Sequence, residues 1–205
     1  DVCSSDLGEE KDWDPESLEY FTSHKIYDEL TPMTLLNLLE VMENARDFYV
    51  VMDSKTFDAA SCEKFYQEFI ETVKSVDKDL LKRFIPQAYS AETYDVITSL
   101  YAFPDVILTC YAIYSASDGW QIYETVSNKK IKSVVMHMND DWAKKVIRDI
   151  YAYGSYGEWT NSDFNIYIHT VNDRDVARSI VNDEGFYGIY TDTISEAEFS
   201  QLIKE

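Results

Sequence analysis

Apolar residues recur at three- and four-residue steps through the first half of the chain, a spacing that places them on one side of a helix. An early series starts after Thr31-Pro32, a helix-start signal, and extends through Met52. A second series follows Asp58, which is suited to be an N-cap. Its members are Cys62, Phe65, Tyr66, Phe69, Ile70, Val73 and Val76. A short helix is predicted to end at Pro86, and Ser90 is predicted to cap another.

Beyond Pro104 the pattern changes to one that is typical of strands. Two runs of β-branched and aromatic residues, 106–114 and 120–126, flank Asp118-Gly119, which together predict a β-hairpin. A third strand is predicted over 131–138. After it the pattern predicts helix, strand, helix, strand and helix, over 140–153, 164–171, 173–182, 185–191 and 196–204. Ser195 and Glu198 have the spacing of a capping box for the last helix.

These elements predict an α+β fold. An N-terminal helical bundle over residues 17–103 would pack against a C-terminal mixed sheet of about five strands with three helices, over residues 104–205. Residues 1–16 form an acidic leader that is expected to be non-native or disordered, and residues 1–7 resemble the translation of a sequencing adapter. The predicted elements therefore begin at residue 17.

The cysteines and the hydropathy predict the cellular location of the protein. Cys62 and Cys110 lie in apolar segments and form no C-x-x-C pair, so both are expected to be buried small hydrophobes in a reducing cytoplasm. No uninterrupted apolar stretch reaches the roughly 18 residues of a membrane helix, so no membrane association is expected.

The charge is strongly negative, with 38 acidic against 18 basic residues and a formal net charge of −20. Residues 1–30 carry −8 and residues 156–205 carry −7, whereas residues 101–155 are balanced. Such a surface repels phosphate backbones, so direct nucleic-acid binding is not expected. It predicts a non-enzymatic binding protein of the inhibitor, immunity or anti-defence type, bacterial or phage, that docks a basic partner such as a nuclease. The simpler interpretation is a well-solvated surface.

Aromatic side chains suggest where such a partner would bind. Tyrosine and tryptophan beside glycine and serine are typical of protein-contact loops. The predicted contact residues are Tyr153, Tyr156, Glu158, Trp159, Asp183 and Glu184. Aromatic rings beside acids can also stack on sugars, so a structural or carbohydrate-binding domain of a longer protein is a further alternative.

Catalytic motifs are scarce. The sequence has no P-loop, no G-x-S-x-G and no G-x-G-x-x-G, so no cofactor is expected. The principal enzymatic alternative is a metal-assisted hydrolase that uses His137, His169, Asp140 and Asp173. Against a metal site, carboxylates at the start of a helix are explained by capping and by the helix dipole. This alternative requires the two histidine rings to lie on the same side of the sheet.

Overall fold

The computed structural model describes residues 22–23, 25, 29–110, 119–137, 165–182 and 187–202. Within these ranges, six strands form one sheet in the order β1-β2-β3-β4-β5-β6, and all neighbouring pairs are parallel. The strands are β1 (Val50–Met52), β2 (Phe84–Ala88), β3 (Ile107–Thr109), β4 (Ser133–His137), β5 (Asn165–His169) and β6 (Gly188–Ile189). Sequential parallel strands with intervening helices are the pattern of a (β/α)8 barrel, of which this sheet is an open arc.

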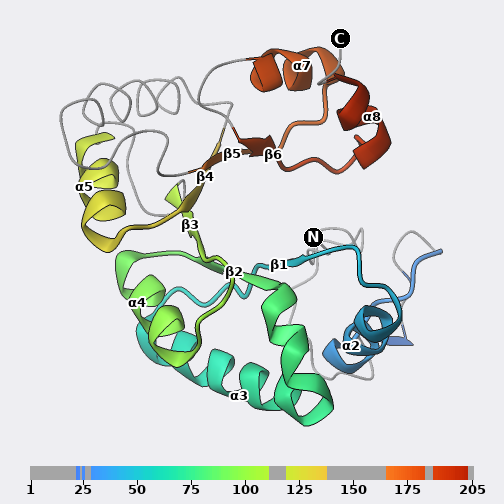
Figure 1. Ribbon diagram of the computed structural model, residues 1–205, viewed down its shortest axis with the longest axis vertical. Coiled ribbons are helices and arrows are strands. Elements are labelled where there is room, and N and C mark those ends of the chain that lie inside the picture. Colours follow the sequence, from blue (N-terminus) through green and yellow to red (C-terminus); the bar gives the residue numbers. More distant parts are fainter. Residues whose placement is uncertain are drawn as a thin grey trace.

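In the described ranges a helix follows every strand except β4, after which residues 138–164 lie outside the described part of the chain. The helices are α2 (Leu35–Asn44), α3 (Ala59–Asp77), the 3-10 helix η2 (Lys78–Arg83), α4 (Ala91–Leu100), α5 (Gly119–Lys129), α7 (Arg174–Asn182) and α8 (Glu196–Leu202). In Figure 1, α3 and α4 lie side by side next to the β1–β2 end of the sheet, and α7 and α8 lie at the β6 end. The order of elements is therefore that of βα units.

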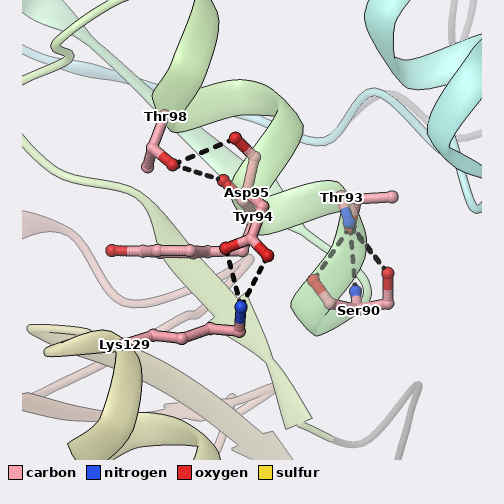
Figure 2. A network of polar contacts seen from close by, with 6 residues as sticks. All are labelled: Ser90, Thr93, Tyr94, Asp95, Thr98 and Lys129. Carbon is pink, nitrogen blue, oxygen red and sulfur yellow. Dashed lines mark hydrogen bonds and ion pairs between the residues drawn. The ribbon is translucent and has the colours of Figure 1, made fainter.

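Local capping starts the helices where the sequence predicts. Asp58 accepts a hydrogen bond from the Ser61 backbone N–H at 2.9 Å, and Ser90 accepts one from the Thr93 N–H at 3.0 Å. Figure 2 shows the Ser90 cap beside an ion pair in which Lys129 of α5 contacts Asp95 of α4. Both predicted caps are confirmed, because they depend only on residues three positions apart.

The core fills the space between the helices and one face of the sheet. Tyr66 and Phe69 of α3 contribute to it, and the Phe69 ring meets that of Phe84 edge to face at a centroid distance of 5.0 Å. Strand residues of the same core are Leu108, Val134, Met136, Ile166 and Ile168. Alternate strand residues point to the other, concave face, which is where the sheet presents its polar groups.

Arg83 connects α2 to the start of β2. Its guanidinium donates to the backbone carbonyls of Met42, Ala45 and Phe48 at 2.6–3.1 Å, and lies 4.8 Å from the Phe48 ring centroid. The Met42 carbonyl lies in the last turn of α2 and the other two follow the helix, in the region where a helix end leaves acceptors unpaired. The arginine thus satisfies them and fixes the entry into β1.

The predicted helical bundle over a mixed sheet is wrong. Strands β1 and β2 lie within the segment that the periodicity assigned to helices, and the sheet is entirely parallel. Each of these strands is short, with three residues in β1 and five in β2, so its apolar run is too brief to show the alternation that identifies a strand. The predicted hairpin is wrong as well, because residues 120–126 lie in α5, where Ile122 and Val126 share its buried side.

Two narrower predictions have clear outcomes. Cys62 and Cys110 are both free and buried, as expected for small hydrophobic residues. Among the helices in the described ranges, none has the length and apolarity to cross a bilayer.

Candidate active site at the carboxyl ends of the strands

Polar side chains gather at the carboxyl ends of the strands, the edge at which (β/α)8 barrels carry their active sites. Each of the six strands supplies at least one, either from its own length or from the residues that follow it. In chain order they are Asp53, Lys55, Gln87, Thr109, His137, His169, Tyr190 and Asp192. The parallel sheet therefore converts positions far apart in sequence into one polar row.

His137 and His169 form the centre of this row. They are register partners at the ends of β4 and β5, and their ring centroids lie 4.6 Å apart with the planes at 69°. Both rings are therefore on the same side of the sheet. Nδ1 of His169 lies 2.8 Å from the hydroxyl of the exposed Thr170, a contact that orients the ring.

The surroundings of His169 disfavour its protonated form. Burial lowers the pKa of His169 below its ordinary value, and the positive charges of His137 and Lys55 lower that pKa further. Asp192 and Asp53 act in the opposite direction, with smaller effects. His169 is consequently a neutral imidazole near pH 7, which is the form that can accept a proton.

Asp53 and Lys55 follow β1 and form an ion pair with each other. Lys55 has a φ of 53°, in the left-handed region that a lysine seldom adopts, and its backbone N–H donates to the Tyr89 hydroxyl at 3.4 Å. Non-glycine residues held in this region concentrate at functional sites. The backbone conformation of Lys55 and this hydrogen bond thus fix the point from which its side chain extends.

Gln87 and Asn172 form hydrogen bonds with residues that follow β6. Gln87 donates from Nε2 to the Tyr190 hydroxyl at 3.1 Å. Asn172 donates to the Asp192 carboxylate at 2.9 Å and accepts from the Asp192 backbone N–H at 2.8 Å. These contacts hold the segment after β6 against the ends of β2 and β5.

The structure brings some of the predicted site residues together and not others. The hydrolase alternative required His137 and His169 on one side of the sheet, and the structure places them there. Asp173 does not join them, because its carboxylate caps α7 by accepting from the backbone N–H groups of Asp175 and Val176. Asp140 lies outside the described residues, as do all six predicted contact residues, Tyr153, Tyr156, Glu158, Trp159, Asp183 and Glu184.

Sequence reasoning missed Asp53, Lys55, Gln87 and Tyr190 as site residues. The signal that could have found them is position, because polar residues directly after a buried parallel strand face the functional edge of the sheet. For Asp53, Lys55 and Gln87 that signal was hidden because Val50–Met52 and Phe84–Ala88 were predicted to lie in helices.

No family profile matches the sequence, and no curated protein matches it. Solved structures do resemble it in fold. A glycerophosphodiester phosphodiesterase from Parabacteroides distasonis superposes with a TM-score of 0.59 at 13% identity, over 92% of this chain and 71% of that one. A putative glycerophosphoryl diester phosphodiesterase from Silicibacter pomeroyi gives 0.58 at 13% identity, over 83% of this chain and 55% of that one. At this identity the likeness shows the fold.

The prediction of an acidic, non-enzymatic inhibitor or immunity protein is contradicted by these findings. The structural neighbours are named as phosphodiesterases, and the fold gathers proton-transfer groups at one edge of its sheet. The physical reason for the error is that net charge reports on solubility and association but carries no information about fold. The enzymatic alternative agrees better with the structure.

Proposed function

We propose that this chain is a phosphodiester hydrolase whose substrate binds on the concave face of the sheet, at the carboxyl ends of its strands. The observation that carries the proposal is the paired, same-side placement of His137 and His169 with Lys55 close enough to influence His169. The names of the structural neighbours supply the substrate class, a glycerophosphodiester. The fold alone would not, since one barrel fold supports many reactions.

Each group has a role that follows from its chemistry. The Lys55 ammonium binds a non-bridging phosphate oxygen, and Asp53 orients that ammonium through their ion pair. His169, neutral near pH 7, accepts a proton from water as the water oxygen bonds to phosphorus. The bond from phosphorus to the departing alcohol oxygen breaks, that oxygen takes up a proton from solvent water, and His169 returns its proton to solvent. His137 packs against His169, and its positive charge lowers the pKa of His169.

The hydrolase alternative predicted from the sequence included a metal ion, and the described residues do not support that metal site. There, no group of three or more histidine, cysteine, aspartate or glutamate side chains is placed to hold a metal ion. His137 and His169 come together, but Asp173 is used as a helix cap.

Hydrolysis of glycerophosphodiesters by the purified chain tests the proposal, with release of the alcohol as the measured quantity. His169→Gln is expected to lower kcat by at least about a hundredfold, in line with the loss of a general base. Lys55→Met is expected to raise KM, because it removes a charged contact to the substrate.

The matched control is Lys82→Met. Lys82 forms an exposed ion pair with Asp79 in η2, next to the amino end of β2 and away from the histidines. This variant should keep the activity of the parent. Turnover that is absent from the parent chain, or that survives unchanged in His169→Gln, would overturn the proposed function.

A further inference from the structure

The residues that follow β1 form a tight loop around Lys55, the residue proposed to bind the substrate phosphate. Its φ of 53° is in the left-handed region, which costs a lysine energy and persists only where the surrounding structure holds it. The hydroxyls of Ser54 and Thr56, on either side of it, lie 2.8 Å from each other. The direction in which the lysine extends therefore depends on the contacts that hold this loop.

Tyr89 holds this loop from the neighbouring strand. It comes directly after β2, and its hydroxyl oxygen accepts a hydrogen bond from the Lys55 backbone N–H at 3.4 Å. Its ring also packs against that of the exposed Phe57, with the two centroids 4.8 Å apart. Tyr89 therefore contacts the loop at two points, one on each side of Thr56.

Tyr89 is itself fixed at the start of α4. It is buried, and its backbone N–H donates to the Thr93 hydroxyl at 3.1 Å. The same hydroxyl accepts from the Ser90 N–H at 2.9 Å, within the cap that Figure 2 shows. Thr93 is buried as well. The cap of α4 therefore sets the place at which the Tyr89 hydroxyl meets the loop after β1.

We propose that Tyr89 is a positioning residue, which holds the Lys55 backbone so that the lysine ammonium meets the phosphoryl group of the substrate. This role rests on the proposed function, in which Lys55 binds a non-bridging phosphate oxygen. It links the residue after β2 to the site through a hydrogen bond that does not involve the substrate. Because the loop is held before the ligand arrives, less conformational freedom is lost on binding, and the benefit falls on affinity rather than on the chemical step.

The test compares Tyr89→Phe with the parent chain, because this variant keeps the ring against Phe57 and removes only the hydroxyl that accepts from Lys55. The matched control is Tyr101→Phe, which changes a tyrosine at the other end of α4. Both changes are also made in the Lys55→Met background. Hydrolysis of a glycerophosphodiester gives kcat and KM separately, and titration calorimetry with inorganic phosphate gives the affinity for the anion.

Tyr89→Phe is expected to raise KM and the phosphate dissociation constant by about threefold to tenfold, the range for one hydrogen bond, and to leave kcat within about twofold. In the Lys55→Met background the same change should have no effect, because there is no ammonium left to position. An equal loss in both backgrounds, or a fall in kcat at constant KM, overturns the positioning role. A Tyr89→Phe variant that matches Tyr101→Phe in both measurements overturns it too.

Amide exchange provides a second measurement should Tyr89→Phe fold poorly. In the parent chain the Lys55 N–H is expected to exchange with deuterium at least about tenfold more slowly than in an unstructured peptide, because a hydrogen bond protects it. Exchange of this amide at the unstructured rate overturns the contact with Tyr89.

The phosphate titration separates this inference from the proposed function. If the parent chain binds phosphate without turnover, and Tyr89→Phe weakens that binding only when Lys55 is present, the hydrolase proposal fails while the positioning role stands. If the parent chain hydrolyses the diester and Tyr89→Phe does so with the same KM, the hydrolase proposal stands and the positioning role fails. A parent chain that neither binds phosphate nor hydrolyses the diester overturns both.

Discussion

The imidazole rings of His137 and His169 lie edge to face with centroids 4.6 Å apart, at equivalent positions on adjacent parallel strands. Because β4 and β5 are in register, the two side chains leave the sheet on the same side and at the same height. Burial and the positive charge of His137 both lower the pKa of His169. These two imidazoles are the candidate proton-transfer groups of the site.

Stability should depend on pH through His169. Its folded pKa is lowered, chiefly by burial, so below the unfolded value of about 6.5 the unfolded chain binds more protons than the folded chain. The free energy of unfolding is therefore expected to fall as the pH drops from about 7 to 5. Urea unfolding at several pH values measures it, and His169→Gln should flatten the decline. An equally steep decline in that variant would contradict the assignment.

Arg83 is expected to be the residue whose loss most weakens the junction of α2 and β2. Arg83→Met would leave the carbonyls of Met42, Ala45 and Phe48 without their donor and lower the free energy of unfolding by about 2–4 kcal/mol. Arg83→Lys should recover part of the loss, because an ammonium can replace some of these bonds. Chemical denaturation of the two variants checks this, and a loss below about 0.5 kcal/mol in Arg83→Met would refute it.

Gly188 is needed for the close approach of β6 to β5. A Cβ at this position would lie 3.2 Å from Cδ1 and Cε1 of Tyr167, so Gly188→Ala must displace that ring. We expect a cost of about 1–2 kcal/mol. Thermal unfolding measures the loss, and near-ultraviolet circular dichroism should change because Tyr167 also contacts the rings of Tyr187 and Tyr190. An unperturbed spectrum and midpoint would show that the ring adjusts freely.

The buried thiols should be unreactive in the folded chain. Burial raises the pKa of Cys110 and, less strongly, that of Cys62, so neither forms the nucleophilic thiolate near neutral pH. In a Cys3→Ser variant, which removes the third cysteine, a thiol reagent is expected to modify no site until denaturant is added and two sites thereafter. Rapid labelling without denaturant would contradict the burial of these side chains.

The sequence alone determined what depends on neighbours a few residues away. The caps at Asp58 and Ser90, the capping box of Ser195 and Glu198, and the apolar side of α3 all follow from interactions within about one turn of helix. The strands β4 and β5 were also predicted close to their observed positions.

Only the tertiary structure decided the sheet and the site. Strands as short as β1 and β2 show no clear period of their own, so they became strands through pairing with neighbours distant in sequence. The same pairing brought His137 beside His169, and the curl of the sheet brought Gln87 to Tyr190. Neither contact has a local signature, because parallel strands meet only through crossover connections and their side chains come together only after the sheet has formed.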